Sequence, residues 1–368
     1  RHLQHGWSFL PRERGQFVDM LPARQQLNDQ TWYRGTADAV WQNAHIMKDH
    51  YKPKYVLILA GDHIYKMDYM QMIRDHVTSG AKVTVGCIEV PREQATAFGV
   101  MAVNEKLKVK AFVEKPSDPP PMPDRPGSSL ASMGIYVFDA AVLRDGLAQL
   151  NTNNAQGEQY LTDILRYAHD LDRPVGALIT DDVWQTEGVN DRVQLARMSQ
   201  ELNRRILERW MREGVTIVDP RNTWVDVDVD LSQDVTLMPG VILQGATTIA
   251  SGAVIGPDTT LQDVEVGENA TVIRSHGSFA IIGDGATVGP FSYLRPGTQL
   301  GSGGKIGAFV ETKNAVVGEG SKIPHLSYVG DAVIGDGVNI GAGTIFANYD
   351  GVNKSATHVG NSAFIGSN

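Results

Sequence analysis

The sequence contains little cysteine and no long hydrophobic run, and both absences exclude classes of protein. Cys87 is the only cysteine among 368 residues, so neither an intrachain disulfide nor a cysteine-ligated metal cluster can form. A reducing compartment suits such a chain. No run of about eighteen uncharged apolar residues occurs, and no charged-then-apolar signal stands near the start. We therefore expect a cytoplasmic protein that is neither exported nor membrane-spanning.

Extended blocks of basic residues are also missing. The 33 Lys and Arg residues are outnumbered by 42 Asp and Glu residues, which gives a formal net charge of −9. This balance disfavours a general nucleic-acid or membrane-surface binder, so we expect small-molecule partners, with no nucleic acid and no membrane. The chain begins with Arg1 rather than Met, which leaves open that an upstream segment has been lost.

Glycine is distributed unevenly and indicates two domains. More than half of the 38 glycines lie after residue 230. Upstream, apolar runs at 54–60 and 81–88 alternate with helix-like stretches such as 68–77, which is the pattern of an α/β sheet with crossover helices. Residues 190–213 carry apolar side chains at helical spacing. We predict an α/β domain at 1–189, a linker helix at 190–213 and a second domain at 214–368.

The second domain shows a six-residue hydrophobic period. Such a period is typical of a parallel β-helix in which each short strand points one aliphatic side chain inward, whereas a β-sandwich would alternate with period two. The inward positions that the period predicts are Leu243, Ile249, Ile255, Leu261, Ile282, Val288, Leu294, Leu300, Ile306, Val317, Ile323, Val329, Ile334 and Ile340.

Asp62 directly follows the apolar run 56–60 and is a candidate metal ligand. Ligands bind at the carboxyl edge of open α/β sheets, and phosphoryl chemistry needs a hard cation such as Mg²⁺ held by one or two oxygen ligands. An aspartate at a strand end can equally well cap a turn or the following helix. From this residue alone, both interpretations stay open.

Glu114 and Lys115 follow a strand-like run at 109–113 and precede a proline-rich loop at 116–127 that cannot be regular structure. Lys115 could hold a sugar phosphate as a point charge. A single lysine is more often simply solvated, so this pair needs further context.

His325 lies in one of three stretches that break the hexad rule, at 294–297, 309–313 and 324–328. Residues that a structural repeat does not require suggest a site. Acyl transfer to an amine needs a base near neutral pH, and histidine titrates in that range. The alternative is a surface histidine of the solenoid.

Residues 1–139 resemble the middle of bacterial ADP-glucose pyrophosphorylase. Six stretches match in order: GWSF at 6–9, WYRGTADA at 32–39, GDHIYK at 61–66, AFGVM at 97–101, FVEKP at 112–116 and SMGIYVF at 132–138. The resemblance implies that Gly35 and Thr36 lie along a nucleotide, that Asp62 binds magnesium, that Glu114 and Lys115 hold the sugar phosphate and that Ser132 touches the sugar. That family opens with a glycine-rich phosphate loop, and we expect the domain to be N-terminally incomplete without it.

Residues 140–368 resemble the bifunctional enzymes that are both N-acetylglucosamine-1-phosphate uridylyltransferase and glucosamine-1-phosphate acetyltransferase. The matching stretches are NTNNAQGEQYLTD at 151–163, EGVNDRVQL at 187–195, HLSYVGD at 325–331, NIGAG at 339–343 and NYDG at 348–351. The resemblance implies a left-handed β-helix of the acetyltransferase type that forms trimers. Further coils follow in that family beyond the position of Asn368 and help to hold coenzyme A, so we expect a C-terminally truncated β-helix.

The second resemblance also implies roles for individual residues. His325 would be the general base, and Asn190 would complete the magnesium pair with Asp62. Arg295, Lys313, Tyr328, Asn339 and Lys354 would bind the amino-sugar phosphate, Glu311 would lie nearby, and Ala342, Asn348, Tyr349 and Ser367 would line the acetyl-CoA groove.

Together the two resemblances predict a hybrid of related enzymes joined near residue 139. The predicted function is acetyl transfer from acetyl-CoA to glucosamine-1-phosphate, and Mg²⁺-dependent transfer from UTP or ATP to a sugar-1-phosphate, forming UDP-N-acetylglucosamine. The alternatives are glucose-1-phosphate adenylyl transfer for glycogen synthesis and an inactive β-helix that serves as an oligomerisation scaffold. The sequence leaves the choice between UTP and ATP open.

Overall fold

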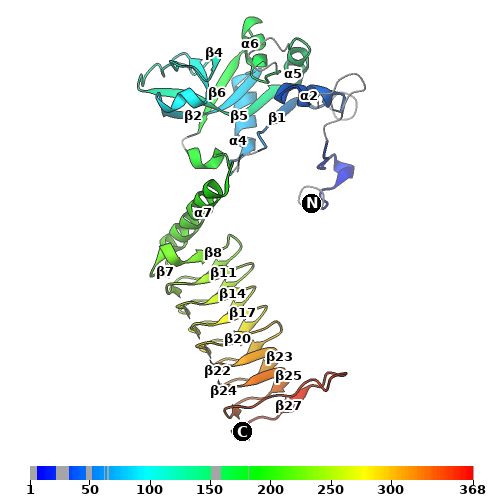
Figure 1. Ribbon diagram of the computed structural model, residues 1–368, viewed down its shortest axis with the longest axis vertical. Coiled ribbons are helices and arrows are strands. Elements are labelled where there is room, and N and C mark those ends of the chain that lie inside the picture. The colour runs from blue at the N-terminus through cyan, green and yellow to red at the C-terminus, as the bar shows by residue number, and fades with distance from the viewer. Residues whose placement is uncertain are drawn as a thin grey trace. The chain divides into compact units, whose positions relative to one another are not determined.

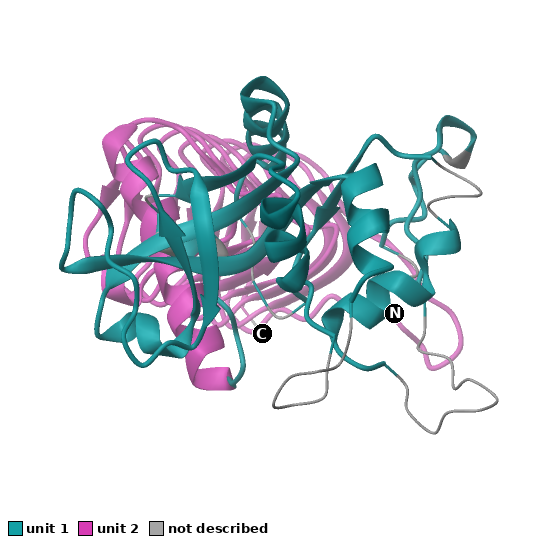
Figure 2. Ribbon diagram, turned by 90° about the horizontal axis from the view of Figure 1, so that it is seen from above, with its two compact units in different colours: residues 1–191 teal, residues 192–368 magenta. Residues whose placement is uncertain are grey.

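The computed structural model describes residues 6–21, 33–46, 52–61, 63, 66–150, 159–180 and 182–367. The chain forms two compact units, Arg1–Asp191 and Arg192–Asn368, which Figure 2 colours separately. None of the helices within the described ranges combines the length and the apolar character that crossing a bilayer requires.

The first unit is built on a mixed sheet with strand order β4-β3-β5-β2-β6, and β1 pairs with the remaining length of β5. Among the described strands of this unit, β2 and β6 pair in parallel and the other pairs are antiparallel. The sheet thus contains more antiparallel pairs than the predicted α/β sheet with crossover helices would have. Its strands are β1 (Tyr55–Ile58), β2 (Val83–Pro91), β3 (Gly99–Val103), β4 (Val109–Glu114), β5 (Ser128–Asp139) and β6 (Val175–Thr180).

Helices cover both faces of this sheet. The helices are α2 (Thr36–Gln42), α3 (Ala44–Ile46), α4 (Tyr69–Ser79), α5 (Ala140–Leu147) and α6 (Asp163–Asp170), with 3₁₀ turns η1 (Arg12–Arg14), η3 (Gln94–Ala97) and η4 (Val183–Thr186). Side chains of α2, α5 and α6 share one buried cluster with the sheet, whereas Met72 of α4 belongs to a second cluster. Asp68 caps α4 by accepting a hydrogen bond from the Met70 N–H at 2.9 Å. The proline-rich loop 116–127 contains neither helix nor strand, as predicted.

The second unit is a parallel β-helix whose short strands stack coil upon coil (Figure 1). One sheet contains β7 (Thr216–Ile217), β10 (Thr236–Leu237), β13 (Val254–Ile255), β16 (Thr271–Val272), β19 (Thr287–Val288), β22 (Lys305–Ala308), β24 (Lys322–His325), β26 (Asn339–Ile340) and β28 (Phe364–Ile365). The other contains β8 (Trp224–Val225), β9 (Asp230–Leu231), β11 (Ile242–Gln244), β12 (Thr248–Ile249), β14 (Thr260–Gln262), β15 (Glu265–Val266), β17 (His276–Ser278), β18 (Ile281–Ile282), β20 (Tyr293–Leu294), β21 (Gln299–Leu300), β23 (Glu311–Val317), β25 (Tyr328–Ile334) and β27 (Thr357–Val359).

The β-helix core confirms the six-residue period. All fourteen inward positions predicted above are buried, with at most 2% of each residue exposed. Aliphatic residues stack in register from coil to coil, as Val272 pairs with Ile255 below and Val288 above. Each short strand buries one aliphatic side chain, and burial of apolar surface stabilises a fold by about 25 cal/mol per Å². The repeated inward positions therefore form the hydrophobic core of the β-helix.

Helix α7 (Arg192–Arg212) covers the first coils of the β-helix, next to the 3₁₀ turn η5 (Pro220–Asn222). Leu207 and Trp210 join the buried core of the coils. Buried Asn203 donates to the Thr223 carbonyl at 2.7 Å and accepts from the Val225 N–H at 3.1 Å, which satisfies backbone groups at the end of the stack. The role of this helix as a linker between domains stays a prediction.

Candidate functional site

Polar side chains form two columns on one outer face of the β-helix. In the first column, Glu311 pairs in register with Tyr293 on one neighbouring strand and with Tyr328 on the other. Adjacent strands lie about 4.8 Å apart, and residues two positions apart point to the same face of a sheet. Arg295 and Lys313 therefore form a second column beside the first.

Arg295 is held by an ion pair with Glu311. The Arg295 Nη1 atom donates to Glu311 Oε1 at 2.8 Å, and both side chains are partly exposed. The hydrogen bond to Glu311 raises the pKa of Arg295 above its ordinary value, so this guanidinium stays charged. The ion pair holds the Arg295 guanidinium of the second column against the Glu311 carboxylate of the first.

Asp331 connects several of the predicted site residues. Its carboxylate accepts hydrogen bonds from Asn348 Nδ2 at 2.5 Å and from Asn314 Nδ2 at 2.9 Å, and Asn348 Nδ2 also lies 3.5 Å from the Tyr328 hydroxyl. These amide hydrogen bonds, with smaller effects from the charges of Lys313 and Lys354, lower the pKa of Asp331. Asn348, and through it Tyr328, is thus linked to one carboxylate, on which the charges of Lys313 and Lys354 also act.

Residues 346–356 leave the coil and return to it, and three predicted site residues lie on this segment. The Phe346 N–H donates to the Tyr328 carbonyl at 2.9 Å, and the Ser355 N–H donates to the Asn348 carbonyl at 3.0 Å. Tyr349 and Lys354 face each other in an antiparallel bridge. The segment therefore begins and ends beside the coil that contains Tyr328.

His325 stands apart from this polar cluster. It ends β24, pairs in register with Ala308 and is exposed, and no side-chain hydrogen bond or ion pair joins its ring to another described residue. Asn339 lies on β26 in register with Lys322, Ala342 is half-buried and Ser367 is exposed. Contacts gather the residues around Asp331, whereas they connect neither His325 nor Asn339 to that group.

Sequence reasoning did not select Asp331 and Asn314 as site residues. Both adopt left-handed backbone conformations, with φ of 49° and 44°, at the corner where β25 and β23 bend. Asn and Asp tolerate this conformation better than other non-glycine residues. A polar residue at a coil corner is therefore the signal that could have identified them.

The predicted magnesium pair can be described only in part, because Asp62 lies outside the described residues. Its neighbour His63 forms a backbone bridge with Gly188, and the Lys66 N–H donates to the Gln185 carbonyl at 3.0 Å. Asn190, which is exposed, follows two residues after Gly188. No cluster of three His, Cys, Asp or Glu side chains suited to a metal occurs in the described part of the chain. Carboxylate and amide oxygens are nevertheless the donors that Mg²⁺ prefers.

The predicted sugar-side residues lie at the same level on strands β4 and β5, which flank β3. Val100 pairs with both Ala131 and Val113, which immediately precede Ser132 and Glu114. Ser132 sits where the β2–β5 register shifts, and its hydroxyl lies 3.4 Å from the Tyr136 hydroxyl. Glu114 and Lys115 are exposed, and Lys115 has a φ of 44° at the end of β4. Strand pairing thus aligns Ser132 in the middle of β5 with Glu114 and Lys115 at the end of β4, with β3 between them.

Gly35 and Thr36 lie at the start of α2 and contact a distant segment. Gly35 has a φ of 107°, a conformation that side chains rarely adopt. The Ala37 N–H donates to the Gln159 carbonyl at 3.1 Å, and the Leu161 N–H approaches Thr36 Oγ1 at 3.5 Å. Gln159 and Leu161, just before α6, thus hold the start of α2, where the predicted nucleotide-binding residues lie.

Residues 1–227 match the family model described as nucleotidyl transferase. The match covers most of the chain and accords with the mixed α/β sheet described above. The chain belongs to the nucleotidyl transferase family.

Curated relatives of this chain carry the name bifunctional protein GlmU. The relative from Rhodococcus opacus (strain B4) is 61% identical over 234 residues, which cover 64% of this chain and 47% of the relative. The relative from Pseudarthrobacter chlorophenolicus is 60% identical over 235 residues (64% and 48%), and that from Paenarthrobacter aurescens (strain TC1) is 51% identical over 299 residues (81% and 59%). The chain thus spans about half of the length of these relatives.

Proposed function

We propose that the chain is a transferase of sugar-nucleotide synthesis that acetylates glucosamine-1-phosphate with acetyl-CoA and transfers a nucleotidyl group to a sugar-1-phosphate, forming UDP-N-acetylglucosamine. The polar cluster on the β-helix carries this proposal. Arg295 and Lys313 lie in the column beside that of Glu311 and Tyr328, and Lys354 lies on the segment that also carries Asn348. A group of cations of this kind suits a phosphorylated sugar. A β-helix that served only as a scaffold would not require this group of side chains.

In the acetyl transfer, the cations hold the sugar phosphate, and His325 acts as the general base. The amine nitrogen attacks the acetyl carbonyl carbon, the new C–N bond forms, and the C–S bond breaks with the thiolate as leaving group. His325 takes the proton that the nitrogen loses. Its exposed ring has no competing side-chain partner in the described structure, so it is accessible to an incoming amine.

The nucleotidyl transfer would use the strand edge of the first unit. Asp62 and Asn190 would hold Mg²⁺, which neutralises phosphate charge as pyrophosphate leaves. Gly35 and Thr36 would lie along the nucleotide, whereas Glu114, Lys115 and Ser132 would contact the sugar phosphate. The alignment of Ser132 with Glu114 across β3 supports this arrangement. UTP and ATP both remain candidate substrates.

The hybrid origin and the alternative functions remain hypotheses. Relatives that match over 234 or 235 residues are 57–61% identical, whereas those that match over 289 to 307 residues are 49–53% identical. This difference is compatible with lower similarity toward the first part of the chain, where we predict an ADP-glucose pyrophosphorylase-like segment. The relatives' names favour neither ADP-glucose synthesis for glycogen nor an inactive scaffold. A location in the cytoplasm also stays a prediction.

We also propose that the β-helix forms a trimer. Phe291, Phe309 and Leu326 are exposed at successive corners of the coils, and the rings of Phe291 and Phe309 stack with centroids 5.4 Å apart. An apolar ridge of this kind suits contact with further copies of the chain.

The acetyl-transfer half is tested by following thiol release from acetyl-CoA in the presence of glucosamine-1-phosphate. We expect activity in the parent chain and a loss of about 100-fold or more in His325→Ala, because general-base catalysis contributes about 10²–10⁴-fold. His358→Ala is the matched control, since His358 is an exposed histidine on β27, outside the predicted site.

A parent chain that releases no thiol, or a His325→Ala variant as active as the His358→Ala variant, would contradict this assignment. Pyrophosphate exchange with UTP and ATP, measured on the same preparation, tests the nucleotidyl-transfer half separately. Failure of both assays would leave the scaffold hypothesis.

A further inference from the structure

The carboxylate of Asp331 joins two parts of the β-helix that are separate along the chain. On one side lie Lys313 and Asn314 of the bent strand β23, and on the other lies Asn348 of the segment 346–356. Asp331 itself stands at the corner of β25, three residues after Tyr328. The two asparagine amides reach different oxygens of the same carboxylate, Oδ1 and Oδ2.

A carboxylate can only accept hydrogen bonds, and this fixes the orientation of both amides. The Nδ2 atom of Asn348 must point toward Asp331, so its Oδ1 atom is turned away from the carboxylate and is available to accept from a ligand N–H. The same contact ties the start of the segment 346–356 to the coil, and the Ser355 N–H closes that segment on the Asn348 carbonyl. Lys354 lies on the same segment, where it forms a backbone bridge with Tyr349.

We infer that Asp331 is a positioning residue for acetyl transfer: it fixes the Asn348 amide and the segment 346–356, so that the residues on this segment meet those on the coil in one site. This inference rests on the proposed acetyl transfer. Asp331 acts through Asn348 and needs no contact with the reacting atoms.

Asp331→Asn tests the inference with little change in shape, because Asn also tolerates the φ of 49° at this corner. The substitution leaves one acceptor oxygen for two amide donors, so the Asn314 or the Asn348 amide must turn or lose its hydrogen bond. We expect the KM for acetyl-CoA to rise about tenfold, the typical effect of losing a hydrogen bond to a charged group, while kcat changes by less than about threefold.

The matched control is Asp336→Asn. Asp336 also lies on a coil and accepts from the Glu319 N–H at 2.8 Å, and no side-chain hydrogen bond or ion pair joins it to the described segment 346–356. An asparagine can keep that single hydrogen bond, so both kinetic constants should stay within about twofold of the parent. A purely structural loss in Asp331→Asn would lower the fraction of active enzyme and so reduce kcat without raising KM.

A double-mutant cycle with Asn348→Ala isolates the connection. If Asp331 acts through Asn348, then Asp331→Asn should change the KM for acetyl-CoA less than about twofold once Asn348 is already alanine. If the two substitutions instead raise the KM for acetyl-CoA independently, so that their fold-changes multiply in the double mutant, the inference is overturned.

Amide hydrogen exchange provides a readout that does not depend on activity. Exchange at residues 346–356 should accelerate about tenfold or more in Asp331→Asn and stay unchanged in Asp336→Asn, whereas exchange in the coils before residue 310 should match the parent in both. Unchanged exchange at 346–356 in Asp331→Asn would overturn the inference. If the parent shows no acetyl transfer, the proposed function fails, and exchange alone still decides whether Asp331 anchors the segment.

Discussion

At the residue scale, His76 is a buried histidine whose titration should affect stability. It is fully buried on α4, its Nδ1 atom lies 2.7 Å from Thr84 Oγ1, and its Nε2 atom has no hydrogen-bond partner in the described structure. The ring meets that of Tyr55 edge-on. Burial lowers the pKa of His76, Asp139 opposes this shift and Lys82 adds to it. The folded state therefore prefers the neutral ring.

Because the folded pKa lies below the unfolded value of about 6.5, the unfolded state binds the extra proton as the pH falls below 6.5. His76 thus contributes stability at neutral pH that is lost in acid. Urea unfolding of the first unit between pH 6.5 and 5 measures this effect. The free energy of unfolding should decrease more steeply with falling pH in the parent than in His76→Asn, by up to about 1.4 kcal/mol per pH unit.

The comparison variant is His169→Asn, which replaces an exposed histidine on α6 and shows how much of any change comes from losing a surface histidine. If the His76→Asn and parent curves run parallel across this pH range, the buried ring is not the group that titrates. The cavity that the smaller asparagine leaves costs the same free energy at each pH, so it cancels from the comparison.

Single residues also show what sequence could and could not reveal about the site. A candidate site residue can be predicted from sequence where it interrupts a structural repeat, as His325 does. Asp331 is different, because its role depends on Asn314, 17 residues earlier, and Asn348, 17 residues later. Its partners come together only when the coil closes and the segment 346–356 folds back, so spacing along the chain does not reveal them.

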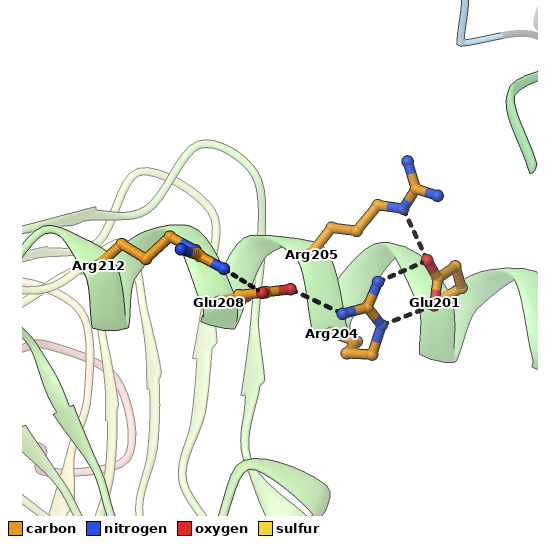
Figure 3. A network of polar contacts seen from close by, with 5 residues as sticks. All are labelled: Glu201, Arg204, Arg205, Glu208 and Arg212. Atoms are coloured by element: carbon orange, nitrogen blue, oxygen red, sulfur yellow. Dashed lines mark hydrogen bonds and ion pairs between the residues drawn. The ribbon is translucent and has the colours of Figure 1, made fainter. Parts of the chain in front are cut away.

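At the scale of elements, helix α7 is stabilised by a chain of ion pairs along one side (Figure 3). Glu201 accepts from Arg204 and Arg205, and Glu208 accepts from Arg204 and Arg212, with shortest N–O distances of 2.7–2.8 Å. These pairs stand three or four residues apart, which is the spacing at which helical side chains meet. Hydrogen bonds from the arginines lower the pKa of Glu201 to about 2.

Glu201→Gln should reduce the free energy of unfolding by about 0.5–1 kcal/mol, because it weakens two exposed pairs worth about 0.3–0.5 kcal/mol each. The carboxylate's contribution is present above the unfolded pKa of about 4.3 and is lost as the pH falls toward 2. Urea unfolding at pH 7 in low salt measures the effect, and 1 M NaCl should reduce it by screening.

Glu213→Gln provides the comparison on the same helix. Glu213 lies 4.0 Å from Arg209, the limit of an ion pair, so its replacement should change the free energy of unfolding by less than about 0.3 kcal/mol. Equal effects of the two substitutions, or an effect of Glu201→Gln that persists unchanged in 1 M NaCl, would show that ion pairing is not its cause.

Elements with a local repeat were predictable, and those paired over long distances were not. Each coil of the β-helix repeats the same inward aliphatic position, so Ile282 or Ile306 can be assigned to the core from a few neighbouring residues. In the first unit, β2 pairs in parallel with β6 and antiparallel with β5, although both are apolar runs of similar character. Local pattern does not encode strand direction, so the mixed sheet emerged only from the structure.

At the scale of the whole molecule, the two units have separate cores. The buried cluster of the β-helix runs from Ile206 to Phe346 and includes residues of α7, whereas the two clusters of the first unit lie between Ala37 and Val175. A unit with its own core is expected to fold by itself. The β-helix end is also covered within its own unit, because Asn203, Leu207 and Trp210 of α7 close the first coils.

We therefore expect residues 192–368, produced alone, to fold with a Tm within about 3 °C of the β-helix transition of the full chain, because little of its core lies elsewhere. Shortening the fragment to 214–368 is the matched control, since it exposes the apolar ends of the coils and should lower Tm by 10 °C or more or cause aggregation. Calorimetry of both fragments and the full chain measures this. A fragment 192–368 that does not fold would show that the β-helix requires the first unit, whereas one that folds and acetylates glucosamine-1-phosphate would place that proposed activity in the β-helix alone.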